Sequence, residues 1–148
     1  MGTMLVLLCC LGFAAAKHKA SEEPPFQYIG GTEDLARGCG GRLEVLKDTI
    51  AFSCPGGSVS VPFGALTLME YRPNLSNQVL RMKIPWKVEP VLGKVKDNEF
   101  FTIVYNVQGT VHALVLRVDP PNMRPYLAEI ELKTGKSVQV YRSYGEFD

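Results

Sequence analysis

The stretch Thr110–Gly135, TVHALVLRVDPPNMRPYLAEIELKTG, predicts one strand that leads directly into one helix. From Thr110 to Val118, apolar and β-branched residues occupy both alternating sides of an extended chain, which is typical of a strand covered on both faces. Pro120 and Pro121 end this strand, because each proline removes one donor from the ladder of hydrogen bonds.

A helix over about 122–134 is predicted to follow the two prolines. Asn122 is a suitable N-cap, Asp119 is a second candidate, and Gly135 is placed to end the helix. One face of the helix is apolar, with residues at i, i+3, i+4 and i+7 spacing: Met123, Tyr126, Leu127 and Ile130. A helix of about three turns is not stable alone, so we expect a sheet beneath it.

The segment 42–54 predicts a β-hairpin with a two-residue turn at Lys47-Asp48. In the register that this turn imposes, four apolar residues share one face of the hairpin: Leu43 opposite Phe52, and Val45 opposite Ile50. The agreement between turn length and hydrophobic pattern supports the hairpin.

Residues 1–16, MGTMLVLLCCLGFAAA, carry no charge and are predicted to be a signal peptide. The apolar run is too short to span a bilayer and ends in alanines typical of a cleavage site, although the positive n-region is missing. A lipoprotein anchored at Cys9 or Cys10 is the less favoured alternative, because Leu8 and Cys9 are poor residues before a lipidated cysteine. We therefore expect a periplasmic or secreted protein that is not transmembrane after signal cleavage.

Cleavage would leave Cys39 and Cys54, and the hairpin register places them within reach of each other if the strand entry bends. An even pair in an exported chain favours a disulfide, and the alternative is two buried free thiols.

The chain has 148 residues, 46% of them hydrophobic, and a net charge of +1, which indicates one ordinary globular domain. This balance gives no reason to expect nucleic-acid binding. Residues 17–25 are predicted to be a flexible tether, 26–142 the domain, and 143–148 a frayed tail. Further strands are expected at 58–63, 65–71, 99–105 and 138–141, and the segment 79–84 is interpreted as another strand. The fold class is therefore α+β, mainly β: a bent antiparallel sandwich or open barrel capped by one C-terminal helix.

Six short segments follow one another at a characteristic spacing: Tyr28–Thr32, Gly41–Val45, Ile50–Phe52, Val61–Phe63, Leu68–Tyr71 and Leu132–Gly135. In this order they resemble a group of small exported bacterial proteins with a PH-like fold, whose role is uncharacterised. The resemblance covers about 26–141. It implies seven strands, one capping helix and bacterial export, and it implies no catalytic residue. Phosphoinositide binding is not expected, because the first hairpin loop holds one cation and one anion, Lys47 and Asp48.

No catalytic, cofactor or metal site is predicted. His18 and His112 are the only histidines and no Cys-x-x-Cys pair occurs, so we do not expect zinc. The sequence shows no nucleophile with an evident base, so we do not expect an enzyme.

The segment 79–96 places cations around the lone tryptophan, and its candidate contact residues are Arg81, Lys83, Trp86 and Lys87. One interpretation is a ligand or membrane contact. The favoured interpretation is a solvated loop that Trp86 anchors to the core.

The sequence thus favours a non-enzymatic exported binding or scaffold module. Its unknown ligand is expected to be a protein or peptide, bound at a sheet edge or in a groove beside the helix. The alternative is a binder of hydrophobic ligands or envelope lipids that uses the 79–96 loop.

Overall fold

A computed structural model of the chain describes residues 23–92 and 99–141. The predicted signal peptide, most of the predicted tether and the tail 143–148 lie outside these residues. The described strands are β1 (Phe26–Gly31), β2 (Gly40–Val45), β3 (Thr49–Cys54), β4 (Gly57–Pro62), β5 (Leu66–Arg72), β6 (Glu99–Val107), β7 (Thr110–Val118) and β8 (Gln139–Val140). The helices are a short 3-10 helix (Phe63–Ala65), α1 (Asn77–Arg81) and α2 (Pro120–Thr134).

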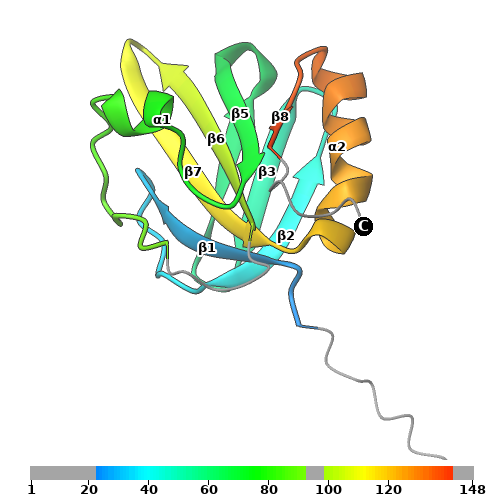
Figure 1. Ribbon diagram of the computed structural model, residues 1–148, viewed down its shortest axis with the longest axis horizontal. Coiled ribbons are helices and arrows are strands. Elements are labelled where there is room, and N and C mark those ends of the chain that lie inside the picture. The colour runs from blue at the N-terminus through cyan, green and yellow to red at the C-terminus, as the bar shows by residue number, and fades with distance from the viewer. Residues whose placement is uncertain (1–22, 93–98, 142–148) are drawn as a thin grey trace, which may run out of the picture.

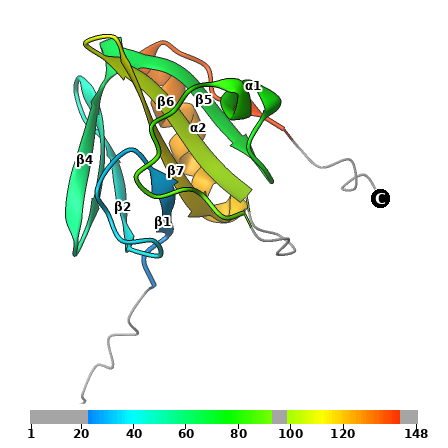
Figure 2. The same ribbon diagram turned by 90° about the vertical axis from the view of Figure 1, so that its left-hand side faces the viewer.

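The strands form one eight-stranded sheet in the order β4-β3-β2-β1-β7-β6-β5-β8. The sheet bends, so that β2–β4 and β5–β7 form two walls, and α2 lies along the open side between them (Figures 1 and 2). Every neighbouring pair is antiparallel except β5 and β8. The predicted α+β, mainly β class is confirmed, with eight strands instead of seven because the short β8 pairs beside β5.

The predicted hairpin register is confirmed. Leu43 pairs with Phe52 and Val45 with Ile50 across β2 and β3, and all four side chains are buried in the main core. A two-residue turn leaves only this pairing, and the hydrophobic pattern agrees with it.

Helix α2 begins at Pro120, two residues before the predicted start. Asp119 is the N-cap, since its carboxylate accepts a hydrogen bond from the Asn122 N–H at 3.1 Å. Prolines fit the first helical turn because their missing N–H has no acceptor there. Gly135 ends the helix with a φ of 67°, as predicted.

The apolar face of α2 covers the inner core. Met123 and Ile130 are fully buried, and Tyr126 and Leu127 pack partly buried against the same cluster. The inner faces of β6 and β7 contribute Phe101, Ile103, Tyr105, Leu114, Leu116 and Val118 to this cluster.

The interpretation of 79–84 as a strand is wrong. The segment contains α1, and the Ser76 hydroxyl caps it by accepting a hydrogen bond from the Val79 N–H at 3.1 Å. Val79 and Ile84 pack on the outer face of the sheet with Leu68, Val104 and Ala113. The 75–92 segment therefore covers the side of β5–β7 that faces away from α2 (Figure 2).

Candidate functional site

A groove lies between β2 and α2, at the part of β2 that β1 does not pair with. Strand β1 pairs with β2 only at Phe26 with Gly41 and Gln27 with Gly40. In this register residue 24 would come opposite Leu43, and Pro24 offers no N–H to extend the ladder. Beyond Gly41, the side of β2 that faces away from β3 is therefore open.

The backbone of Leu43 and Val45 faces this open side. The Leu46 N–H donates to the Thr49 carbonyl at 2.9 Å, and alternate residues of an antiparallel strand point to opposite sides. The backbone N–H and C=O groups of Leu46 therefore point toward β3, whereas those of Val45 and Leu43 point into the groove. Consistent with this direction, the Val45 carbonyl accepts a hydrogen bond of 2.6 Å from Lys133 Nζ of α2.

The groove has a volume of about 500 Å³ and a mostly apolar lining with two carboxylates: Leu43, Glu44, Val45, Leu46, Pro125, Tyr126 and Glu129. Glu129 Oε1 also lies 2.7 Å from Lys133 Nζ, so the Lys133 ammonium group binds both the Glu129 carboxylate and the Val45 carbonyl. Tyr126 separates this groove from a second hollow of about 550 Å³, which Glu23, Pro24, Arg42 and Cys54 help to line. The Tyr126 ring is held edge-on against Phe26, with ring centroids 5.0 Å apart.

Cys39 and Cys54 form a disulfide with a Cα–Cα distance of 5.9 Å. The bridge joins the residue before β2 to the end of β3, beside the second hollow. Disulfides are typical of oxidising compartments, so this pair is compatible with a secreted protein.

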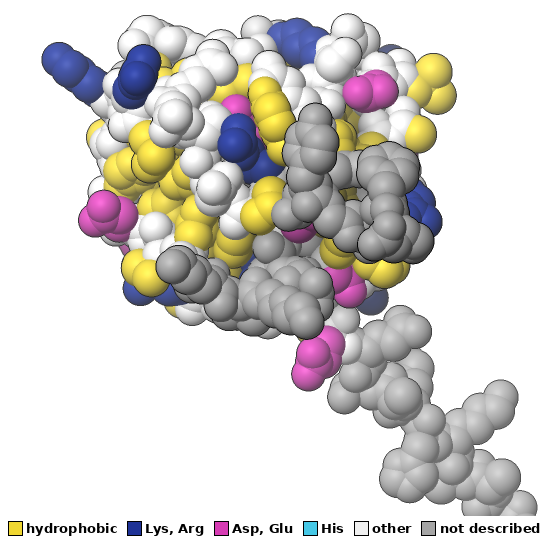
Figure 3. All heavy atoms as spheres, viewed as in Figure 1, with side chains coloured by type: hydrophobic (Ala, Val, Ile, Leu, Met, Phe, Trp, Pro, Cys, Tyr) yellow, Lys and Arg dark blue, Asp and Glu magenta, His cyan; other side chains and the backbone are white. Residues whose placement is uncertain are grey.

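The candidate contact residues of the 79–96 loop lie on the opposite side of the sheet from α2. Trp86 packs, partly buried, against both outer apolar clusters. Arg81, Lys83 and Lys87 are exposed. Lys94 and Lys96 lie outside the described residues. Lysine, arginine and acidic side chains are scattered over the face seen in Figure 3 and do not gather into a patch of one sign.

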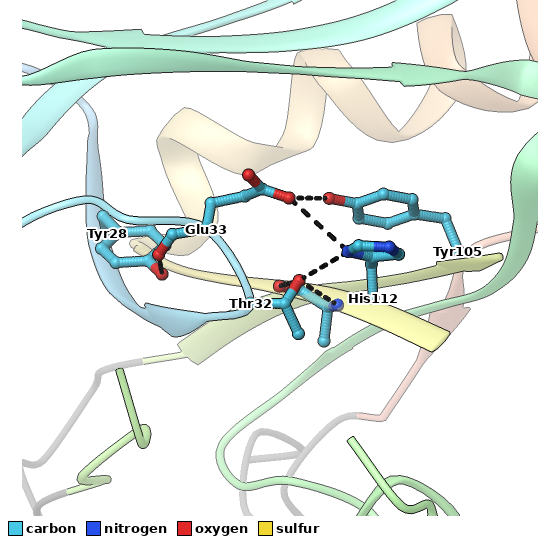
Figure 4. Close-up of polar contacts among 6 residues, drawn as sticks. Tyr28, Thr32, Glu33, Tyr105 and His112 are labelled. Atoms are coloured by element: carbon cyan, nitrogen blue, oxygen red, sulfur yellow. Dashed lines mark hydrogen bonds and ion pairs between the residues drawn. The ribbon is translucent and has the colours of Figure 1, made fainter. Parts of the chain in front are cut away.

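A polar cluster that the sequence did not reveal lies where β1 ends beside β6 and β7 (Figure 4). The Tyr105 hydroxyl donates to Glu33 Oε1 at 2.9 Å, and His112 Nδ1 lies 3.7 Å from the same oxygen. The Tyr105 and His112 rings stack with centroids 5.1 Å apart. The Tyr28 hydroxyl donates to the Glu33 backbone carbonyl at 2.9 Å, so the cluster ties the loop after β1 to the sheet.

This cluster lacks the geometry of a catalytic triad. His112 Nδ1 faces both Thr32 Oγ1, at 3.2 Å, and Glu33 Oε1, whereas a triad needs the nucleophile and the acid on opposite ring nitrogens. The Thr32 oxygen also accepts a hydrogen bond from the Ala113 N–H at 3.2 Å. These hydrogen bonds connect the loop after β1 to β6 and β7.

Three buried tyrosines have pKa values above the usual 10. Burial, followed by the Glu33 carboxylate, raises the pKa of Tyr28 to about 12. Burial and the hydrogen bond to Glu33 raise the pKa of Tyr105, and burial together with Glu99 raises that of Tyr71.

We expect the free energy of unfolding to fall as the pH rises from 10 toward 12. In this window the unfolded chain ionises the three tyrosines while the folded chain keeps them protonated, so the unfolded state binds fewer protons. Each tyrosine contributes about 1.4 kcal/mol per pH unit while only its unfolded form is ionised. Urea unfolding at several pH values measures the slope, and Tyr28→Phe should make it shallower. Tyrosinate absorbance of the folded protein that shows all three ionised near pH 10 would contradict this expectation.

Comparison with protein-family models and with curated proteins finds no match to this chain. Within residues 23–92 and 99–141, no three or more His, Cys, Asp or Glu side chains gather as a metal ion would require. None of the helices in these two ranges combines the length and the apolar character needed to cross a membrane.

Proposed function

We propose that this protein is a non-enzymatic binding module, periplasmic or secreted, that holds an extended peptide segment of a partner protein in the groove between β2 and α2. The open edge of β2 is the observation that carries the proposal. Backbone groups at Leu43 and Val45 point into the groove, where Lys133 Nζ binds the Val45 carbonyl. An added strand would supply N–H and C=O groups at the matching spacing and would take the place of Lys133 at this carbonyl.

The lining of the groove also favours a peptide. Side chains of an added strand alternate, so those on one face would contact Leu46, Pro125 and Tyr126. Lipid tails could use this apolar surface but offer no donors for the carbonyls on the β2 edge. The element order also supports kinship with the exported proteins of PH-like fold, which we propose together with bacterial export.

The test is selection of a displayed library of short random peptides against the full chain. Selected peptides are expected to shift the backbone amide resonances of Leu43, Val45 and Tyr126 in two-dimensional NMR spectra. Leu46→Asp places a charge in the groove from a side chain that is already 46% exposed, so it should weaken binding without unfolding the protein.

Leu132→Asp is the matched control, because Leu132 is 85% exposed on α2 and does not line the groove. It should bind the selected peptides as the wild type does. Enrichment of no peptide, or binding that Leu46→Asp leaves unchanged, would refute the proposal.

Binding of envelope lipid or another hydrophobic ligand through the 79–96 loop is the second candidate. Leu80 and Val91, 64% and 65% exposed, lie in the same segment as the exposed cations Arg81 and Lys87 and favour it. Tryptophan fluorescence tests this candidate, because Trp86 is the only tryptophan in the chain. Under the peptide proposal, vesicles of phosphatidylethanolamine and phosphatidylglycerol leave its fluorescence spectrum unchanged, and a blue shift would favour the second candidate instead.

A further inference from the structure

Strand β4 is one border of the sheet, and no described segment lies along its free side (Figure 2). It pairs with β3 along its whole length, from Gly57 with Cys54 to Pro62 with Thr49. At the other border, β5 is partly covered by β8, which pairs with Glu70 and Tyr71. The two borders therefore differ, and β4 presents the longer open strand.

The backbone groups on the open side of β4 belong to Ser58 and Ser60. The Phe63 N–H donates to the Asp48 carbonyl at 2.9 Å. Because backbone groups of successive residues point to opposite sides of a strand, this bond shows which residues of β4 direct their backbone groups toward β3. The backbone groups that bond to β3 are therefore those of Val61, Val59 and Gly57. The backbone groups of Ser58 and Ser60 point away from β3. The backbone nitrogen of Pro62 also points away from β3, so its lack of a hydrogen removes no hydrogen bond between β4 and β3.

Apart from Pro62 at its end, this border carries none of the usual protection against pairing within the described residues. Natural edge strands are guarded by charged side chains, prolines, bulges or covering segments. Between Asp48 and Glu70 the sequence has no charged residue at all. The β4 pairing with β3 has no register shift, and the Ser58 and Ser60 side chains are small and exposed.

We propose that two copies of this chain associate by antiparallel pairing of β4 with β4 about a two-fold axis. A second copy is the partner that fits, because an uncharged strand of alternating serine and valine meets no charge repulsion from itself and offers no charge to select another partner. The pairing would extend the sheet across the dimer. It leaves the β2 groove free, since that groove lies on the far side of β3.

Pro62 disfavours one alternative register of this pairing. With Ser58 opposite Ser60 of the other copy, each N–H and C=O of both serines finds a partner, and Val59 lies on the axis. A shift by two residues would place Ser60 opposite itself and Ser58 opposite the other copy's proline, which has no N–H to donate to the Ser58 carbonyl.

Sedimentation equilibrium of the full chain tests the proposal. The wild type is expected to be a concentration-dependent dimer. Ser60→Pro removes one outward donor per chain without breaking a bond between β3 and β4, so it should raise the dimer dissociation constant about tenfold or more. Ser60→Ala keeps the backbone donor and should dimerise as the wild type does. A wild type that stays monomeric at its highest soluble concentration, or a Ser60→Pro chain that dimerises equally well, would overturn the proposal.

A cross-linking experiment keeps the proposal testable if the proline variant does not fold. Full chains with Cys9 and Cys10 changed to serine carry either Ser58→Cys or Ser60→Cys. Residues in a hydrogen-bonded antiparallel pair have Cα atoms about 5.5 Å apart, within reach of a disulfide. Mild oxidation should link the mixture of the two variants efficiently and each variant alone poorly. Equal linking in all three samples would contradict the proposed register.

A peptide-binding measurement on the folded Ser60→Pro chain distinguishes the two proposals. If this chain is monomeric but still binds the selected peptides, dimerisation and peptide binding are independent, so failure of one proposal would not imply failure of the other.

Discussion

Ile130→Ala is expected to lower the free energy of unfolding by about 2–5 kcal/mol. Ile130 is fully buried at the centre of the α2 face that covers the inner core, together with Met123. The substitution removes apolar contacts and leaves a cavity between the two walls of the sheet, whereas it slightly improves helix propensity. Urea unfolding followed by circular dichroism measures the change.

Leu132→Ala is the control for this prediction, because Leu132 is on the same helix but 85% exposed. Its effect should stay within about 0.5 kcal/mol of the wild type, as is usual for surface substitutions. If both alanine variants had equal stability, α2 would not be packed on the sheet as described.

The prediction of the fold succeeded where local chemistry left one choice. A two-residue turn at Lys47-Asp48 fixes the hairpin register, and the hydrophobic pattern agreed with that register. The apolar spacing in α2 likewise allowed only one face to be buried. These features depend on neighbouring residues, which the sequence displays directly.

The segment 79–84 was misread because its apolar residues suit more than one structure. Leu80, Met82 and Ile84 alternate as residues of a strand would, but the cap from Ser76 starts a helix and leaves Leu80 exposed. Short apolar runs do not distinguish helix from strand, and here the packing of Val79 on the outer face of the sheet decides.

The polar cluster was beyond prediction because its members are distant in sequence. Tyr105 is 72 residues from Glu33, and His112 is 80 from Thr32. The pairings of β1 with β7 and of β7 with β6 bring them together. The sequence predicts a groove beside the helix, but it does not show that β1 and β2 pair at only two positions, because that pairing joins segments that are not neighbours in the hairpin.

Replacing Cys39 and Cys54 together with serine is expected to lower the free energy of unfolding by about 3 kcal/mol, because the bridge closes a loop with a sequence separation of 15. The loss arises mainly in the unfolded chain, which gains conformations when the bridge is absent. Serine is close to cysteine in size, so the half-buried positions beside β2 and β3 should keep their packing. The measurement is urea unfolding of the variant and of the oxidised wild type.

The matched control is the wild type under reducing conditions, whose stability should approach that of the double serine variant. Alkylation without prior reduction, followed by mass spectrometry, should leave Cys39 and Cys54 unmodified in the oxidised protein. If both thiols were alkylated, or if the double variant were as stable as the oxidised wild type, the bridge would not stabilise the fold. The disulfide would then also cease to support an oxidising compartment, and the case for export would rest on the N-terminal sequence alone.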